Sequence, residues 1–150
     1  MVEEDPLNWE IEPPENFLDS HFLYHAVHII LWINWPNLDK IHSNFFSYGK
    51  AEKGLSTDWN KYASPEDTLM RRIEASLEKN GIIELNISNL RNLIQENNFP
   101  MMIRHAPEII PPVNRAHSLI EGIHKINKTK IKRKLSKIAH WAPNMKPIKV

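Results

Sequence analysis

The stretch Asn-Arg-Ala-His-Ser-Leu-Ile-Glu-Gly (114–122) sets an apolar pair beside polar and chemically reactive side chains. Successive side chains of a β-strand point to opposite faces of its sheet. A strand over residues 116–123 therefore has two different faces, one with Ala116, Ser118 and Ile120 and the other with His117, Leu119 and Glu121. The alternation predicts such a strand, and it turns Ser118 away from His117.

His117 is the first candidate for a catalytic residue. An imidazole titrates near neutral pH and can serve as a general base, and the neighbouring Arg115 has the planar fork that holds a phosphate or carboxylate. Asn114 is a further binding candidate and Glu121 a further catalytic one. The alternative is a half-buried strand histidine that donates to a backbone carbonyl.

A catalytic partner for His117 has to come from elsewhere in the chain, and Ser56 and His25 are the candidates. Gly54 precedes Ser56 by two residues, so a ligand can approach the backbone there, although an ordinary turn explains the same glycine. His25 lies between two further histidines at positions 21 and 28. Three imidazoles at helical spacing can share a metal ion, but a strand would separate His28 from the other two, and no metal site is predicted.

The composition is that of a folded protein of one domain. The chain has 150 residues with 41% hydrophobic and 25% charged residues, and a domain of that size buries roughly 70% of its unfolded surface. It has no cysteine, which excludes disulfides and thiolate chemistry. No apolar run approaches the ~20 residues of a membrane helix, and no signal peptide is recognisable. A cytoplasmic location without membrane attachment is expected.

Charge is distributed unevenly along the chain. Residues 1–100 hold 8 Lys or Arg and 16 Asp or Glu, whereas residues 101–150 hold 11 and 2, so a formal charge of −8 is followed by +9. Seven of the thirteen residues from Lys125 to Lys137 are basic. A helix there would carry a thin apolar stripe for docking, and its cations would attract the phosphates of a nucleic acid or an acidic protein. Internal pairing with the acidic N-terminal arm is the alternative. The candidate binding residues are Lys130, Arg133, Lys134 and Lys137.

The order of elements predicts an α+β fold with a mixed, mainly antiparallel sheet and about three helices, because strands and helices occur without regular βαβ alternation. Residues 1–16 form an extended acidic lead-in, 17–123 the core, and 124–150 a basic helix with a tail. Residues 17–35 fit either a strand or a helix, with a strand at about 22–30 favoured. Further strands are expected at 41–48, 82–87 and 101–105. Helices are expected after Ser64, with an apolar stripe through Leu69, Met70, Ile73 and Leu77, and after Ser88.

Several short landmarks together resemble a group of small uncharacterised prokaryotic proteins, over roughly residues 20–123. They are Leu23-Tyr24, Val27-His28, Ser43, Phe45-Phe46, Gly54-Leu55-Ser56, Pro65-Glu66, Gly81 and Ala116-His117-Ser118-Leu119-Ile120. This resemblance implies a compact α+β domain. The chain is also similar to ADP-ribosyltransferase-type folds, where an early basic residue, a serine on a middle strand and a late acid line the NAD cleft. The corresponding positions are His25, Ser56 and Glu121.

Two functions follow as hypotheses. The first is a binding module that engages nucleic acid or an acidic partner through the basic C-terminal helix. The second is a small hydrolase or ADP-ribosyltransferase-like transferase that processes a nucleotide or nucleic acid, with His117 working together with His25 or Ser56. The second hypothesis requires these side chains to meet in one pocket.

Overall fold

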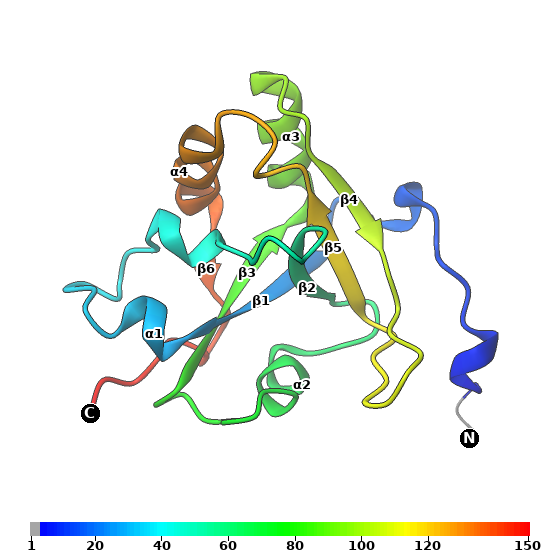
Figure 1. Ribbon diagram of the computed structural model, residues 1–150, viewed down its shortest axis with the longest axis horizontal. Coiled ribbons are helices and arrows are strands. Elements are labelled where there is room, and N and C mark those ends of the chain that lie inside the picture. Colours follow the sequence, from blue (N-terminus) through cyan, green and yellow to red (C-terminus); the bar gives the residue numbers. More distant parts are fainter. Residues whose placement is uncertain (1–3) are drawn as a thin grey trace.

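A six-stranded sheet runs through the middle of the molecule (Figure 1). The computed structural model describes residues 4–150. The strand order is β4-β5-β2-β1-β3-β6, and every neighbouring pair is antiparallel. The strands are β1 (Phe22–His28), β2 (Leu55–Trp59), β3 (Asn80–Asn86), β4 (Met102–His105), β5 (His117–Glu121) and β6 (His140–Trp141). The predicted α+β class with an antiparallel sheet is confirmed.

Four α-helices and three 3-10 turns accompany the sheet in the described residues, close to the three helices expected. The α-helices are α1 (Ile29–Trp32), α2 (Pro65–Met70), α3 (Ile87–Asn97) and α4 (Lys128–Ile138), and the 3-10 turns are η1 (Pro6–Asn8), η2 (Pro14–Asn16) and η3 (Ser43–Phe46). Within residues 4–150, none of the helices has the length and apolar character needed to cross a bilayer.

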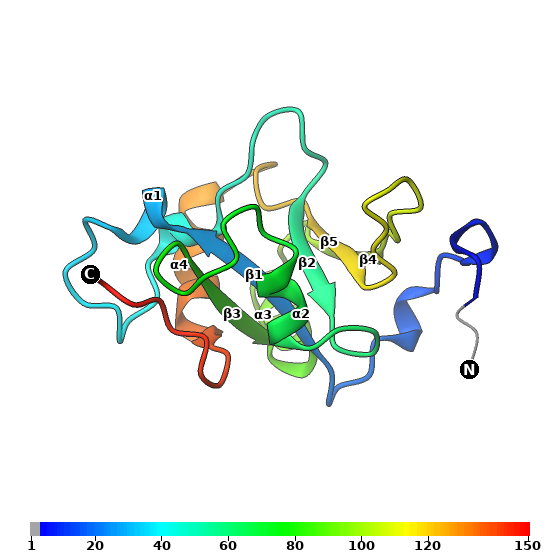
Figure 2. The ribbon, with the colours of Figure 1, turned by 90° about the horizontal axis from the view of Figure 1, so that it is seen from below.

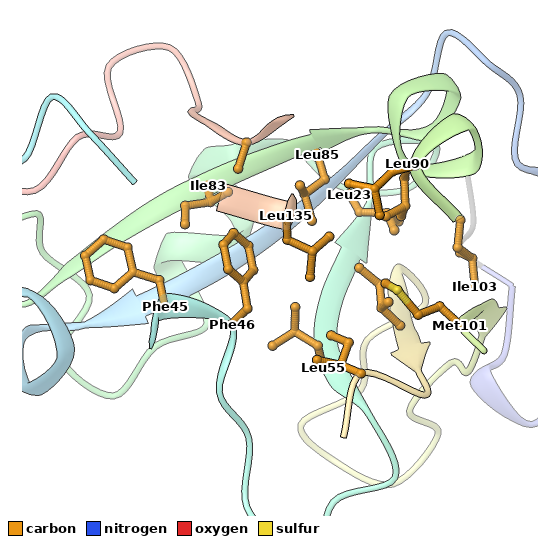
Figure 3. Close-up of a cluster of buried hydrophobic side chains, with 14 of the residues drawn as sticks. Leu23, Phe45, Phe46, Leu55, Ile83, Leu85, Leu90, Met101, Ile103 and Leu135 are labelled. Carbon is orange, nitrogen blue, oxygen red and sulfur yellow. The ribbon is translucent and has the colours of Figure 1, made fainter. Parts of the chain in front are cut away.

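The two faces of the sheet carry different layers. Helices α3 and α4 and the turn η3 cover one face, where Leu23, Ile83 and Leu135 belong to one large apolar cluster (Figure 3). Helix α2 lies across the other face (Figures 1 and 2), where Tyr24 and Ile82 pack with Leu69 in a smaller cluster. The second cluster extends over β1 and β3, and a cleft opens beside it over β1, β2 and the start of β5.

Residues 17–35 form a strand and then a short helix. The predicted strand is confirmed as β1, but it ends at His28, whose Nδ1 accepts a hydrogen bond from the Ile30 amide and caps α1. The strand predicted at 41–48 is wrong, because this segment forms η3. There Phe45 and Phe46 are both fully buried in the same large cluster, whereas a strand would turn two adjacent side chains to opposite faces. His42 caps the turn by accepting from the Asn44 amide.

The helix predicted after Ser64 begins as expected and ends early. Ser64 and Asp67 form a reciprocal capping box at the N-terminus of α2, but the helix stops at Met70. Met70 and Ile73 are exposed, so the predicted apolar stripe is wrong at these two positions, whereas Leu77 packs against the smaller cluster from outside the helix. Gly81 lies inside β3, where a Cβ would stand 2.6 Å from Trp141 and Pro147.

The remaining predicted elements hold with shifted ends. Helix α3 starts at Ile87 and is capped by Asn86, which accepts from the Asn89 amide at 3.0 Å, and not by Ser88. With this start, Ile87 and Leu90 lie at the beginning of the helix, and both are fully buried. The strands predicted near 82, 101 and 116 appear as β3, β4 and β5.

Both ends of the chain pack on the body. In the lead-in, Glu12 bonds to Lys61 and Tyr62, so the acidic arm does not pair with the basic helix. Residues 4–150 contain no ion pair between α4 and a carboxylate. The tail docks through β6 and the buried Met145, whose carbonyl accepts from the Ile82 amide.

Candidate functional site

A cleft of about 500 Å³ opens on the α2 side of the sheet. Its floor comes from β1 and β2, and its walls come from α2 with the segment after it, from residues 47–52, and from the loop 108–114. In Figure 2 these three segments surround the middle of the sheet. The volume lies within the ~300–1,000 Å³ typical of small-molecule sites. Three predicted catalytic residues line this one cleft, namely His25, Ser56 and His117.

Strand register explains why Ser56 and His117 meet. Asp58 lies directly opposite His117 in the β2–β5 ladder, and directly opposite residues share a face of the sheet. Ser56 is two residues before Asp58 and so faces the same way. Ser56 and His117 are therefore diagonal neighbours, and the serine Oγ lies 3.0 Å from the histidine Nε2.

A backbone carbonyl fixes the proton on the other side of the ring. His117 Nδ1 lies 2.8 Å from the oxygen of Ala106, which can only accept a hydrogen bond, so Nδ1 carries the proton. Nε2 of the neutral ring then has a free lone pair and accepts from the Ser56 hydroxyl. The resulting chain, from hydroxyl to imidazole to carbonyl, has the parts of an activated nucleophile: a hydroxyl, a base in contact with it, and a group that orients the base. Ser56 itself is exposed at the cleft surface.

His25 has a different environment. Its Nδ1 lies 2.9 Å from the Ser56 carbonyl and its Nε2 lies 2.7 Å from the Phe45 carbonyl. Burial lowers the pKa of His25, and the two carbonyl contacts act against this shift. The β1–β2 ladder contains only two residue pairs, which end at Tyr24 opposite Asp58. One residue further on, the His25 ring lies between the carbonyls of β2 and η3, and in its neutral form it donates a hydrogen bond to one of the two.

Asp58 holds the walls of the cleft together, a role that the sequence analysis did not predict. The side chain is buried and accepts hydrogen bonds from Thr68 Oγ1 at 2.8 Å, Arg71 Nη1 at 2.5 Å and Asn114 Nδ2 at 2.8 Å. These partners belong to α2, to the segment after α2 and to the loop before β5. One carboxylate on β2 thus anchors two walls to the floor.

The predicted binding residues Asn114 and Arg115 separate. Asn114 lines the cleft, where it donates to Asp58 and accepts from the Ala116 amide. Arg115 points to the lead-in instead: its guanidinium pairs with Glu4 at 3.2 Å and lies over the ring of Tyr62. It does not line the cleft and cannot serve there as an anion clamp.

Two other arginines line the cleft, Arg71 and Arg72. Arg71 uses one nitrogen for Asp58, and Arg72 makes no ion pair with any of residues 4–150. Helix α2 ends at Met70, and both arginines therefore lie at the cleft. The sequence analysis predicted a helix that continues through Leu77, so it did not predict this position for them. The pair of adjacent arginines was the available signal.

Glu121 lies apart from the cleft, near the end of β5, where it accepts from Arg104 Nε at 2.8 Å. Of the three positions implied by the similarity to ADP-ribosyltransferases, only His25 and Ser56 therefore line the cleft. No group of three or more His, Asp or Glu side chains that could hold a metal ion occurs in the described part of the chain.

The basic residues of α4 lie on the opposite side of the sheet from the cleft. Ile131 and Leu135 dock the helix on the large cluster, as predicted. Lys130, Arg133 and Lys137 are exposed and Lys134 is half-buried. Lys132 turns inward, where its Nζ donates to Ser47 Oγ at 2.8 Å and burial lowers its pKa.

Comparison of the chain with protein-family models, with curated proteins and with solved structures finds no match.

Proposed function

We propose that the cleft is an active site in which Ser56 is the nucleophile and His117 the general base of a small hydrolase or transferase. The observation that carries the proposal is the 3.0 Å contact between Ser56 Oγ and His117 Nε2, combined with the Ala106 carbonyl on Nδ1. A serine hydroxyl is a weak nucleophile until a base removes its proton. Here the base is in contact, and its tautomer is already the one that accepts.

The proposed step is a substitution at an acyl or phosphoryl centre. Ser56 Oγ forms the new bond, its proton moves to His117 Nε2, and the leaving group departs from the attacked centre. The imidazolium then returns the proton to the leaving group. Water or a second substrate afterwards takes the group from Ser56, and the choice between them decides hydrolysis or transfer. Asp58 has no role in proton transfer and acts by holding Arg71, Thr68 and Asn114 in place.

Diisopropyl fluorophosphate tests this proposal without knowledge of the substrate. In the expected reaction, Ser56 Oγ bonds to phosphorus, fluoride leaves, and the hydroxyl proton passes to His117. Intact-mass measurement and peptide mapping should find a single adduct on Ser56. Ser56→Ala should abolish it, and His117→Gln should slow it by at least about 10²-fold, the lower end of general-base contributions.

Ser136→Ala provides the matched control. Ser136 lies on α4, and its hydroxyl donates only to the Arg133 carbonyl. Labelling of this variant should equal that of the unmodified protein. Adducts distributed over several serines, a His117→Gln variant that labels at the normal rate, or no adduct at all would each end the proposal.

A second function is favoured by one specific observation on α4. Its exposed cations have no carboxylate partners within residues 4–150, so the positive charge of this helix is not neutralised inside the molecule. A polyanion, in the first place the phosphate backbone of a nucleic acid, is the partner that suits such a helix. Specific base contacts are not part of this proposal.

Mobility shift with a DNA duplex and an RNA hairpin tests the second function. Binding should weaken steeply as salt rises, because each phosphate contact releases counterions. Replacing Lys130, Lys134 and Lys137 together by Glu should abolish it, whereas Lys53→Glu, an exposed charge reversal outside α4, should not. Binding that is unaffected by salt and by the triple substitution would refute the second function. Binding of a negatively charged protein instead of nucleic acid would identify an acidic protein as the partner of α4.

A further inference from the structure

The cleft contains cationic groups that the Ser56–His117 pair does not use. Of the side chains lining it, five carry formal charge: Arg71 and Arg72 against Glu52, Asp58 and Glu108. Asp58 is fully occupied by three donors, one of them Arg71 Nη1. Glu52 accepts from the Gly49 amide at 3.3 Å on the far wall. Arg72, on the wall that follows α2, is therefore a cation without an ion-pair partner among the described residues, although Glu52 and Glu108 also lack one and the formal charge of the lining is −1.

The guanidinium groups offer more donors than the protein uses. Each has five N–H donors in a planar fork, Arg71 spends one on Asp58, and Arg72 spends none on an ion pair within the described residues. Such a fork matches the oxygens of a phosphate group and binds it through two parallel hydrogen bonds. Arg71 is held in position by a buried carboxylate, so little side-chain freedom is lost when it binds an anion.

The number of charges limits the ligand. With three carboxylates in the same cleft, a polyphosphate would bring more negative charge than Arg72 and the free edge of Arg71 can balance. A single phosphate group brings at most two negative charges, which the fork of Arg72 and the free N–H donors of Arg71 can meet together. The volume of about 500 Å³ is larger than a phosphate needs, so the cleft has room for the organic part of an ester as well.

We infer that Arg71 and Arg72 form the anion-binding subsite of this cleft, and that its substrate is an ester carrying one phosphate group. This inference rests on the proposed active site, because the subsite defines which molecules are brought to Ser56. It assigns substrate recognition to two residues from the segment after α2 and removes it from Arg115.

Isothermal titration with phenyl phosphate, AMP and tripolyphosphate tests the inference without any reaction at Ser56. Phenyl phosphate and AMP should both bind, and tripolyphosphate should bind no more tightly than either. If AMP binds much more tightly than phenyl phosphate, the substrate is a nucleotide; equal affinities indicate a broader class of monoesters. Both results support the subsite.

Arg72→Met should weaken the binding of phenyl phosphate about ten- to a hundredfold, the range expected for losing hydrogen bonds to a charged group. Arg91→Met is the matched control, since Arg91 lies on α3 and binds Asp19 and the Pro14 carbonyl. Circular dichroism confirms that both variants are folded. Equal losses in the two variants, tighter binding of tripolyphosphate, or no binding of either ester at 10 mM, roughly the weak limit of specific recognition, would overturn the inference.

Labelling and titration separate the two proposals. A phosphate ester that binds through Arg72 while Ser56 resists the fluorophosphate would leave the subsite intact and remove the nucleophile. Labelling of Ser56 without phosphate binding would do the reverse.

Discussion

Replacing Asp58 by Ala should destabilise the protein strongly, although the residue lies at a cleft and not in the apolar core. Asp58 is buried, with 5% of the residue's surface exposed, and its carboxylate accepts from three side chains on different segments. Asn114 loses the acceptor of a buried amide, which costs about 1–3 kcal/mol. Thr68 keeps the Ser64 carbonyl at 3.3 Å and loses less. Arg71, whose side chain is 36% exposed, regains water, so its ion pair adds at most about 1 kcal/mol.

The total expected loss is about 2–5 kcal/mol, a large part of the ~5–15 kcal/mol by which domains are stable. Urea unfolding measures it, and with a slope of about 1.5–2 kcal/mol per molar the midpoint should fall by roughly 1–3 M. Asp39→Ala is the control, because the Asp39 side chain is 75% exposed and its pair with Lys146 should contribute less than about 1 kcal/mol. A loss below about 1 kcal/mol for Asp58→Ala, or equal losses for both variants, would refute the reasoning that this carboxylate anchors the cleft walls.

Three further outcomes are expected. Burial raises the pKa of Glu12, but hydrogen bonds from Lys61, Tyr62 and Asn16 outweigh burial and lower this pKa to about 2 from 4.5. The stability that Glu12 contributes is therefore present above about pH 4.5 and is lost as the pH falls toward 2. The thermal unfolding temperatures of the protein and of Glu12→Gln should converge over that range. Gly122→Ala should cost more than about 1–3 kcal/mol in urea unfolding, because φ is +92° and a Cβ would stand 1.9 Å from the Pro100 oxygen; a neutral substitution would contradict this. Ile73→Ser should change stability by less than about 0.5 kcal/mol, since the side chain is 104% exposed, whereas Leu69→Ala should cost about 2–5 kcal/mol.

Local patterns predicted those elements whose residues follow a regular spacing. The strand β5 was predicted from the alternation of its residue types, although Ser118, Leu119 and Ile120 are all buried. The basic helix α4 was predicted from the four-residue spacing of Ile131 and Leu135, which are both buried. The segment around Phe45 could not be read correctly, since its two phenylalanines enter the core from a turn that no periodic pattern describes.

The sequence predicted the residues of the candidate site that lie on β2 and β5, but it did not predict the arginines that line the cleft. A serine after Gly54 and a histidine after Asn114 were both visible as reactive residues in the sequence. Their contact depends on the register of β2 against β5, which no local pattern determines. Arg71 and Arg72 depend on where α2 ends, and Met70 and Ile73 continued the apolar spacing past that point. The position of the Arg115 side chain depends on the lead-in, because its guanidinium pairs with Glu4 there and not with a group in the cleft.

The positions of the cleft and the basic helix make the two proposed functions independent. The cleft opens on the α2 face of the sheet, whereas α4 covers the other face and its side chains pack on the large cluster (Figures 1 and 3). A polyanion bound along α4 therefore leaves Ser56 accessible, and charge reversal on α4 removes no donor from the cleft. A hydrogen bond joins the two regions, from Lys132 on α4 to Ser47 at the edge of the cleft. Because Lys132 is buried, this bond holds the wall formed by residues 47–52 in place whether or not a polyanion is bound. Each of the two proposed functions can therefore fail in its own experiment without affecting the other.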